Sequence, residues 1–365
     1  MDRDTLQANA VEALLRNRRL ICQWATGVGK SMVVLKFIKE NRGPEFKTLI
    51  LVPETVNISN WEEEFKKFNV SMDGVSIACY ASLHKYEDTE WDLLVLDEVP
   101  HIDTELRSGI LGTMDADYII ALGAVVTEEE RETLTRLFGP FVRSRVGLQE
   151  AIVTGILPSP TVNIVHMQLD DTRKNRWYDG NLLTDRGVYR AIQNKLEVAK
   201  KKFLDNATDW NKIKMNQIGS ERKRFLGKCK DEAIKLICDK LDEKNKRYLC
   251  FCSSIAQAKQ LGGDRAFTSQ TPVSLKLLQR FNDGEINALF VVAKLIEGQN
   301  LKDIDCGVLG QLGNSHRITV QECGRIMRSD KPFIFVPVFD DTKDNVFLST
   351  VTNNIPKEYI KHYKF

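Results

Sequence analysis

A short, largely apolar run at residues 19–22 leads into the segment Trp24-Ala-Thr-Gly-Val-Gly-Lys-Ser31, and apolar residues recur at helical spacing up to residue 41. A buried strand that turns through glycines directly into a helix is typical of a parallel α/β sheet, and this restricts the fold strongly. Gly27 and Gly29 permit a tight turn whose N–H groups point at an anion, at the positive end of the next helix. The segment therefore predicts a loop that cradles phosphate.

Two side chains of this phosphate loop indicate nucleotide chemistry. Lys30 can reach the β- and γ-phosphates, and the Ser31 hydroxyl can ligate Mg²⁺. The loop departs from the usual pattern at Trp24, where glycine or alanine is common. A chance turn of similar composition is the alternative, and the flanking strand and helix argue against it. The expected ATP contacts in this segment are Ala25, Thr26, Gly27, Val28, Gly29, Lys30 and Ser31.

Short apolar runs alternate with amphipathic segments along most of the chain, which predicts parallel strands joined by helices. The first series of strands is expected at residues 20–23, 48–52, 76–80, 93–96 and 118–122. A turn-rich boundary near residue 157 is followed by strands expected at 161–169, 248–252, 288–293, 306–309 and 333–338. The fold class is α/β, with two doubly wound parallel-sheet lobes, residues 1–157 and 158–365, and a helical insertion in the second.

Composition excludes several classes of protein. The 365 residues carry a formal net charge of only +2, so the overall charge does not indicate a nucleic-acid partner. No apolar run is long enough to span a membrane, and the first residues lack a signal-peptide pattern. The eight cysteines are scattered without zinc-ligand spacing, which favours buried, reduced thiols. These features predict a cytoplasmic protein without a membrane partner.

The insertion, at about residues 171–243, has a strong local positive charge that is balanced by acidic residues elsewhere in the chain. Residues 173–235 hold 17 Lys or Arg against 8 Asp or Glu, a net charge of +9. Basic residues interleaved with aromatic ones suit phosphate contact combined with base stacking. A solvated helix face whose aromatic side chains pack inward is an equally good interpretation. The candidate nucleic-acid contacts of the insertion are Lys200, Lys201 and Lys202.

A second constellation follows the apolar run at residues 92–96, where Asp97 and Glu98 stand next to each other. Hydrolysis of a nucleotide bound to a phosphate loop needs one carboxylate for Mg²⁺ and one to polarise the attacking water. Asp97 is the candidate for the metal and Glu98 for the water. A polar strand end of no catalytic importance is the alternative, which the phosphate loop on the same predicted sheet disfavours.

A third constellation lies near the C-terminus, in the segment from Gln321 to Arg328. Arg325 and Arg328 are three residues apart and so share one face of a helix. Arginines can reach a γ-phosphate from a neighbouring lobe in this way. Alone, such a pair is usually part of a surface ion pair.

Together the three constellations resemble the superfamily 2 helicases and translocases, with a DExH-type box at residues 97–101. Residues 51–53 and 60–65 look like motif Ia of Swi/Snf-type ATPases, and residues 79–86 resemble the later nucleic-acid-contacting motif of lobe one. Residues 296–301 resemble motif V, and residues 321–328 resemble motif VI. A narrower likeness, on residues 277–284 and 293–300, is to compact phage-type enzymes of the UvsW kind.

The resemblance implies two RecA-like lobes with ATP and Mg²⁺ bound between them. The catalytic residues it implies are Lys30, Asp97, Glu98, Gln321, Arg325 and Arg328, with Ser31 and Asp97 at the metal. Further implied ATP contacts are Gln7, at the position of the adenine-contacting glutamine, His101, Glu297, Gly298 and Asn300. The implied nucleic-acid contacts outside the insertion are Pro53, Glu54, Thr55, Ser82 and Lys294.

The resemblance thus predicts an ATP-dependent DNA helicase or translocase. It would act as a monomer on single-stranded, forked or branched DNA, in a bacterial or phage-infected cell. One motif departs from the family: Gly123 and Ala124 stand where motif III usually carries hydroxyl residues that help couple hydrolysis to strand separation. A duplex translocase or a nucleotide-dependent clamp without strand separation is therefore an alternative. RNA is an alternative track, because backbone contacts distinguish the two sugars poorly.

Overall fold

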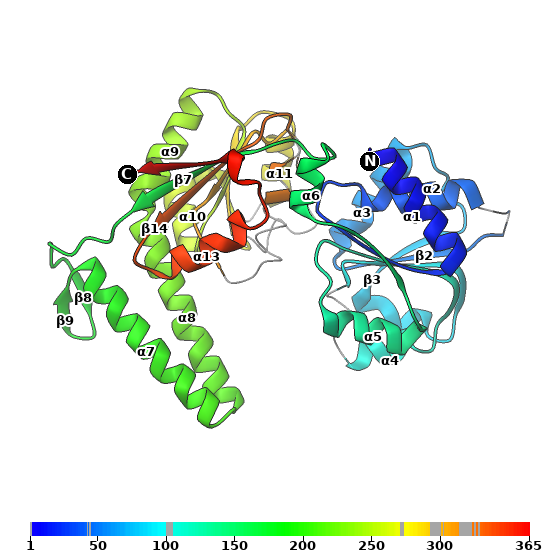
Figure 1. The fold of residues 1–365 in the computed structure, drawn as a ribbon, viewed down its shortest axis with the longest axis horizontal. Coiled ribbons are helices and arrows are strands. Elements are labelled where there is room, and N and C mark those ends of the chain that lie inside the picture. The colour runs from blue at the N-terminus through cyan, green and yellow to red at the C-terminus, as the bar shows by residue number, and fades with distance from the viewer. Residues whose placement is uncertain are drawn as a thin grey trace. The chain divides into compact units, whose positions relative to one another are not determined.

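A computed structural model describes residues 2–41, 43, 45–99, 105–270, 274–292, 301, 303–313, 323–324, 326–327 and 329–365. By its internal contacts the chain forms two compact units, one ending at Ser159 and the other beginning at Pro160 (Figure 1). Of the later described residues, Leu301, Cys323, Gly324, Ile326 and Met327 group with the first unit. None of the described helices is long and apolar enough to cross a membrane.

The first unit contains a six-stranded parallel sheet in the order β3-β2-β4-β5-β1-β6. Its strands are β1 Arg19–Trp24, β2 Thr48–Val52, β3 Val75–Cys79, β4 Glu90–Asp97, β5 Asp115–Gly123 and β6 Val142–Val146. Its helices are α1 Arg3–Asn17, α2 Lys30–Asn41, α3 Thr55–Lys67, η1 Tyr80–Tyr86, α4 Glu105–Leu111, α5 Glu128–Phe138 and α6 Leu148–Val153. Parallel strands require such crossover helices.

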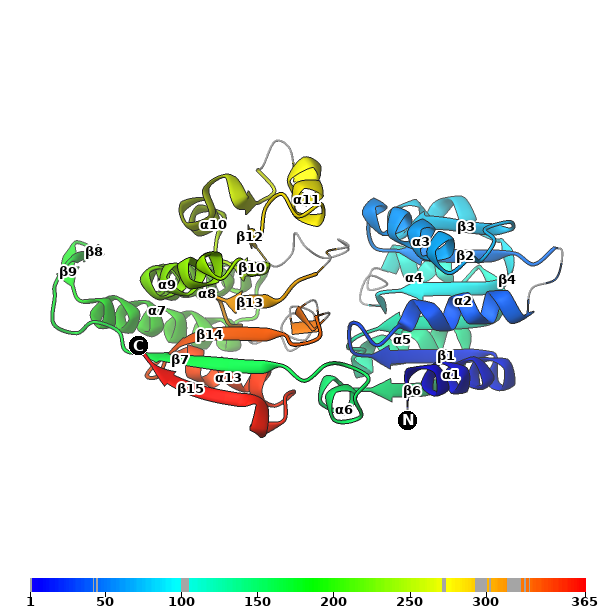
Figure 2. The same ribbon diagram turned by 90° about the horizontal axis from the view of Figure 1, so that it is seen from above.

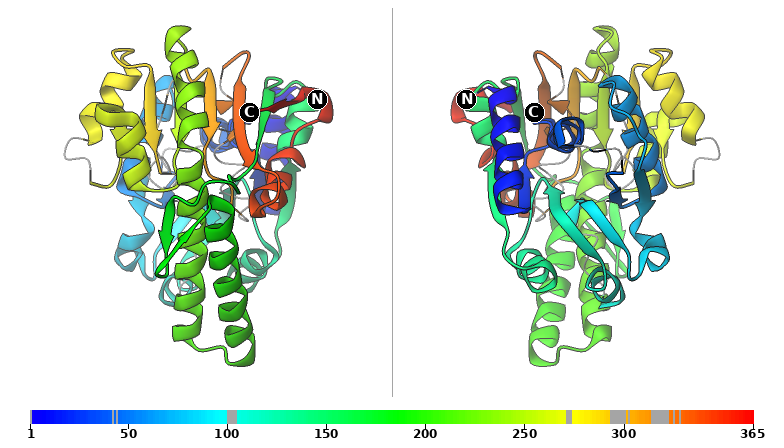
Figure 3. Two further views of the ribbon diagram at one scale, coloured as in Figure 1. Left: turned by 90° about the vertical axis from the view of Figure 1, so that its left-hand side faces the viewer. Right: turned by 90° about the vertical axis from the view of Figure 1, so that its right-hand side faces the viewer.

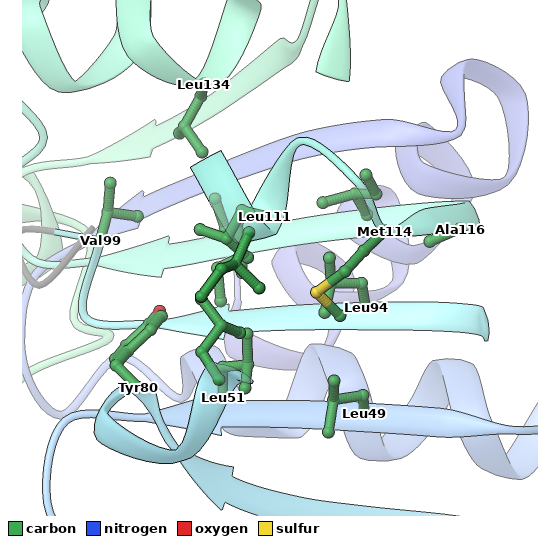
Figure 4. Close-up of a cluster of buried hydrophobic side chains, with 14 of the residues drawn as sticks. Leu49, Leu51, Tyr80, Leu94, Val99, Leu111, Met114, Ala116 and Leu134 are labelled. Atoms are coloured by element: carbon green, nitrogen blue, oxygen red, sulfur yellow. The ribbon is translucent and has the colours of Figure 1, made fainter. Parts of the chain in front are cut away.

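Helices cover both faces of this sheet. Successive strand residues point to opposite sides, so apolar side chains lie on both faces and each face needs a layer of helices to bury them. On one face Leu49, Leu94 and Ile119 belong to a buried cluster that includes Leu111 and Leu134 (Figure 4). On the other face α1 and α2 pack together over β1 and β5. With both faces covered, the central strands are apolar along their length, which is why they were recognisable in the sequence.

The second unit contains a seven-stranded sheet in the order β11-β12-β10-β13-β14-β7-β15, whose pairs are all parallel (Figure 2). Its strands are β7 Thr161–Met167, β10 Tyr248–Phe251, β11 Ala266–Phe267, β12 Ala288–Val291, β13 Cys306–Leu309, β14 Phe333–Phe339 and β15 Ile360–Lys364. Its helical elements after the insertion are α9 Asp231–Glu243, α10 Ile255–Gly262, η3 Gly263–Arg265, α11 Ser274–Asn282, α13 Lys343–Thr352 and η5 Lys357–Tyr359. The predicted fold class, two doubly wound α/β lobes, is confirmed.

The insertion is a long antiparallel helical hairpin, α7 Asp185–Asp205 and α8 Asp209–Cys229, which extends beyond the sheet of its unit (Figure 3). Two corrections to the predicted insertion follow. Residues 176–183 form a small β-hairpin, β8 Arg176–Tyr178 and β9 Asn181–Leu183, rather than helix. Its turn is Asp-Gly with positive φ at both positions, the dipeptide that favours tight hairpins.

The second correction concerns α9, which belongs to the core of the second unit rather than to the insertion. Ile234, Cys238 and Leu241 of α9 lie in one buried cluster with Tyr248 and Val308 from the sheet. The spacing of these three residues is that of one helix face. The projecting part of the insertion therefore ends with α8.

Candidate nucleotide site

The phosphate loop connects the end of β1 to the start of α2 in the geometry that its glycines predict. Gly27 has φ +90° and Gly29 has φ +102°, values that side-chain-bearing residues rarely adopt. A Cβ atom at Gly29 would also lie only 2.6 Å from Gln7 Nε2. Both features require glycine here, since a side chain would strain the backbone and collide with α1.

Lys30 lies folded back over this loop, where its Nζ donates to the Trp24 carbonyl at 3.0 Å. The Trp24 ring is fully buried, and its Nε1 donates to Ser144 Oγ of β6 at 2.9 Å. The unusual first residue of the pattern therefore directs its side chain into the sheet and presents only its carbonyl to the lysine. This arrangement accommodates the departure from the usual glycine or alanine.

Gln7 is placed at the same loop by α1. Its side chain is 2% exposed, and Nε2 donates to the Gly29 carbonyl across a long 3.4 Å. The contact lies beside the loop predicted to hold phosphate. The adenine contact that the sequence assigns to Gln7 stays a prediction.

The first carboxylate of the box, Asp97, ends β4 and is held from two sides. Trp61 Nε1 of α3 donates to Asp97 Oδ2 at 3.0 Å. The Tyr80 hydroxyl donates to the Asp97 carbonyl at 3.0 Å. Burial, reinforced by the negative charges of Asp97 and Glu98, raises the pKa of Tyr80 well above its usual range, so the phenol stays neutral and remains a donor.

Glu98 follows in a backbone conformation that is unusual for its type. Its φ is +53°, in the left-handed region, which glutamate adopts at an energetic cost. Such strained positions concentrate at functional sites, where the surrounding structure holds them in place. The geometry is consistent with a second carboxylate that is turned away from the regular path of β4.

Ser31 contacts the same helix that holds Asp97. Its hydroxyl donates to Glu64 Oε2 at 3.4 Å, a long hydrogen bond. Glu64 is three residues after Trp61, so the two side chains lie on one face of α3. The structure therefore brings the two predicted metal ligands, Ser31 and Asp97, to one helix face, which motif reading alone did not show.

Gly324, from the segment that resembles motif VI, also lies against the phosphate loop. A Cβ atom at this glycine would be 2.5 Å from Thr26 Cβ and 3.2 Å from the Thr26 carbonyl. The Gly324 carbonyl is 3.8 Å from the Cβ position of Gly27. This close approach of two backbones requires glycine in the later segment as well.

The donor set of the first unit fits Mg²⁺ with a nucleotide. Mg²⁺ is usually bound through one or two protein oxygen ligands together with substrate phosphates and water. Ser31 and Asp97 supply a hydroxyl and a carboxylate, beside glycines whose turn suits phosphate. Among the described residues no cluster of three His, Cys, Asp or Glu side chains could hold a metal.

The predicted nucleic-acid contacts of the first unit come together at one end of its sheet. Pro53, Glu54 and Thr55 follow β2, and Ser82 follows β3; the two strands pair with Val52 opposite Cys79. Glu54 and Thr55 are exposed, and Pro53 and Ser82 are partly exposed. Lys200, Lys201 and Lys202 lie on α7 of the other unit.

Several predicted site residues lie outside the described part of the chain. These are His101, Lys294, Glu297, Gly298, Asn300, Gln321, Arg325 and Arg328. Their roles stay predictions from the sequence.

Comparisons with known proteins agree on one type of fold. The profile of one family, the res subunit of type III restriction enzymes, matches residues 2–81. The helicase domain of Hef from Pyrococcus furiosus covers 95% of this chain and 96% of its own at 13% identity, with a TM-score of 0.58. Dbp5 from S. cerevisiae, solved with RNA and ADP BeF3, covers 99% of this chain and 89% of its own at 13% identity, with a TM-score of 0.60. The fold is the RecA-like fold of superfamily 2 helicases.

One sequence relative aligns with most of the chain. A protein from Sulfurisphaera tokodaii named DNA 3′-5′ translocase XPB2 is 25% identical over 371 residues, which cover 91% of this chain and 80% of the relative. The restriction-enzyme family profile matches the part of the chain that contains the phosphate loop.

Proposed function

We propose that this chain is an ATP-hydrolysing motor of superfamily 2 that translocates along DNA or unwinds it. The observation that carries the proposal is the meeting of Ser31 and Asp97 on one face of α3, beside a phosphate loop in a RecA-like unit. The relative named as a DNA 3′-5′ translocase, which aligns with 91% of the chain, supports DNA as the track.

The described residues take distinct roles toward ATP. Bound Mg²⁺ would neutralise phosphate charge, with Ser31 and Asp97 as its protein ligands. Lys30, now on the Trp24 carbonyl, would move to the β- and γ-phosphates. Glu98 would polarise the attacking water from its left-handed backbone position.

Further assignments of the proposal rest on the motif resemblance. Gln321, Arg325 and Arg328 would contact the γ-phosphate, and an arginine finger is worth roughly 10³-fold or more in turnover. His101, Glu297, Gly298 and Asn300 would complete the nucleotide site, and Lys294 would contact the track. The DExH subtype, the phage-type likeness, the monomeric state and the preference for single-stranded, forked or branched DNA belong to the same proposal.

The helical hairpin is proposed as a second contact to DNA, because some of its basic residues are exposed and not used in ion pairs of the described chain. Near its base Arg186 pairs with Asp341 at 2.5 Å, and Lys195 pairs with Asp179 at 2.5 Å. Near its tip Lys201 and Lys202 are exposed and make no ion pair within the described chain. Structural ion pairing therefore accounts for Arg186 and Lys195 but not for Lys201 and Lys202.

Among the aromatic side chains of the insertion, one packs inward and two are largely exposed. Tyr189 is 8% exposed, and its hydroxyl accepts from the Lys343 backbone N–H at 2.9 Å, so it packs inward. Trp177 is 76% exposed and Trp210 is 72% exposed. Trp210 lies in the first turn of α8, near Lys201 and Lys202, an arrangement that suits stacking on an unpaired base.

The proposal is tested by ATP turnover with no polymer and with single-stranded, duplex or forked DNA or RNA. We expect stimulation by DNA, and loss of turnover in Lys30→Ala and Glu98→Gln. The exposed Glu87→Gln, on the same unit, serves as the matched control. Unchanged turnover in Glu98→Gln would remove Glu98 from the role of activating water, and absence of hydrolysis under all conditions would overturn the motor.

A translocase without strand separation is the second candidate, favoured by the absence of hydroxyls after β5. Gly123 ends that strand beside Gln23 of the phosphate-loop strand, and Ala124 is buried. Displacement of a triplex-forming strand without displacement on a forked duplex would identify this activity. DNA binding that responds to nucleotide without phosphate release would instead identify a clamp.

A further inference from the structure

Helix α3 contacts both halves of the metal site through two of its side chains. Trp61 holds Asp97, which ends β4, and Glu64 holds Ser31, which lies in the first turn of α2. The helix itself is firmly anchored, since Trp61 is 4% exposed and Phe65 is fully buried, with their ring centroids 6.4 Å apart. The anchored helix α3 therefore restrains two side chains, Ser31 and Asp97, that lie 66 residues apart in the sequence.

In both hydrogen bonds the donor and acceptor are arranged so that Ser31 and Asp97 keep oxygen lone pairs free to bind a metal ion. Ser31 uses its hydrogen toward Glu64, so the oxygen lone pairs are available to a cation. The indole N–H of Trp61 fixes one carboxylate oxygen of Asp97 and thereby the plane of the group. Such outer hydrogen bonds orient metal ligands and commonly contribute about 10- to 100-fold to metal affinity.

We propose that Trp61 and Glu64 are positioning residues that preorganise Ser31 and Asp97 for the Mg²⁺ of the bound nucleotide. Neither residue needs to touch the nucleotide or the metal. Each acts by restricting the orientation of a ligand before the metal arrives, which lowers the cost of ordering that ligand on binding.

The same helix also begins at the proposed nucleic-acid contacts. Pro53 and Glu54 lead into α3 at Thr55, and the Glu54 backbone N–H donates to Asn57 Oδ1 at 3.2 Å. Trp61 lies six residues further, roughly 9 Å along a helix. Binding of DNA at this end would therefore change the affinity for Mg²⁺ through α3, and Mg²⁺ would change the affinity for DNA equally. This second step rests on the proposed function.

The experiment measures binding of a fluorescent ADP as Mg²⁺ is titrated, with EDTA as the metal-free reference. In Trp61→Phe the ring and its packing on Phe65 remain while the N–H donor is lost. We expect the concentration of Mg²⁺ at half-saturation to rise about tenfold, with ADP binding in EDTA unchanged. Glu64→Ala should raise it in the same direction.

Two further variants separate positioning from other effects. Glu64→Gln keeps an oxygen that accepts from Ser31, so it should retain most of the Mg²⁺ affinity that Glu64→Ala loses. Glu62→Gln removes an exposed carboxylate two residues away and should behave as the unchanged protein. Circular dichroism and melting establish that each variant is folded, and Glu64 variants supply the test should Trp61→Phe unfold.

The outcomes distinguish this proposal from the motor itself. If the unchanged protein shows no Mg²⁺-dependent ADP binding, the proposed function fails. If it shows such binding and both Trp61→Phe and Glu64→Ala match it, the positioning role is wrong. Repeating the titration with a DNA oligonucleotide tests the link: DNA should shift the Mg²⁺ midpoint in the unchanged protein and shift it less in Trp61→Phe, and an equal shift in both would disprove transmission through α3.

Discussion

The backbone of Gly324 lies against Thr26 so closely that an added Cβ would be 2.5 Å from Thr26 Cβ. These residues are about 300 positions apart in the sequence, yet both group with the first unit. Two carbon atoms cannot approach within 3.0 Å of each other without a shift of the structure. Thr26 Cβ is bonded directly to the backbone of a tight loop, so it cannot move away as the end of a flexible side chain can. The later segment therefore limits the conformations of the phosphate loop.

Gly324→Ala should therefore weaken nucleotide binding while the protein stays folded. The new methyl group displaces either the loop or the later segment, and we expect the Kd for a fluorescent ADP to rise about tenfold or more, on the scale of overpacking costs of roughly 1–3 kcal/mol. Gly109→Ala is the matched control, since a Cβ there meets nothing within 4 Å. Equal affinity in both variants would show that the close contact does not constrain the loop.

Gly29→Ala should abolish tight nucleotide binding for a reason that is mainly conformational. The position has φ +102°, and its Cβ would also lie 2.6 Å from Gln7 Nε2. Because the Gln7 side chain can move away but the backbone angle φ of residue 29 cannot change, Gly29→Ala should lower ADP affinity as much in a Gln7→Ala background as in the unchanged protein. Gly139→Ala, at φ +86° with open space around it, is the control for backbone strain away from the loop. A smaller loss in the Gln7→Ala background would instead identify the collision with Gln7 as the cause.

The sequence could predict strands that are buried on both faces and the edge strand β3, but not the edge strands β6 and β15. The predicted strands 48–52 and 306–309 match β2 and β13 residue for residue, since both are continuous apolar runs. Strand β6 reads Val-Arg-Ser-Arg-Val and β15 reads Ile-Lys-His-Tyr-Lys; both lie at sheet edges and are largely exposed. An edge strand needs no apolar run, so its sequence resembles a loop.

The candidate site was predictable where its chemistry is local. The phosphate loop and the Asp97-Glu98 pair are each defined by a few neighbouring residues, so the local sequence pattern was sufficient to predict them. The roles of Trp61 and Glu64 could not be predicted, because their contacts to Asp97 and Ser31 cross 36 and 33 residues of sequence. The spacing W-x-x-E, which places both on one helix face, was the available signal.

Replacing Lys200, Lys201 and Lys202 with alanine should weaken DNA binding and reduce its dependence on salt. Each phosphate contact to a single strand contributes about 0.7 to the slope of log K against log salt. Lys200 also pairs with Glu197 at 2.9 Å, so two to three lost contacts should reduce the slope by about 1.4 to 2.1. Binding measured by fluorescence anisotropy at several salt concentrations checks this value.

A matched triple variant controls for the loss of charge. Lys235, Lys240 and Lys244 are exposed, on or just after α9, away from the hairpin. Their replacement removes the same +3 charge and should leave the salt slope unchanged. If both triple variants reduce the slope equally, the hairpin acts only through the overall charge, and its lysines form an ordinary solvated face.

Asp344→Ala should destabilise the second unit strongly, because it leaves a buried cation unpaired. Lys230 Nζ lies 2.7 Å from Asp344 Oδ2, with the two side chains 1% and 4% exposed. Removing one partner of a buried pair costs about 3–5 kcal/mol, whereas replacing both by apolar residues can be nearly neutral. We therefore expect Lys230→Met with Asp344→Leu to melt close to the unchanged protein in calorimetry. Glu197→Ala, which breaks an exposed pair, should have little effect.

Cys79 should be the first cysteine to react with iodoacetamide in the native protein, and DNA should protect it. It is half-buried at the end of β3, whereas burial raises the pKa of Cys22, Cys229 and Cys306 to about 12. Those thiols stay protonated at pH 8, and each unit of pH below 12 lowers their thiolate fraction about tenfold. Peptide mass spectrometry after labelling with and without DNA measures the difference. Because Cys79 lies three residues before Ser82, equal labelling under both conditions would contradict the proposed DNA contact at this end of the sheet.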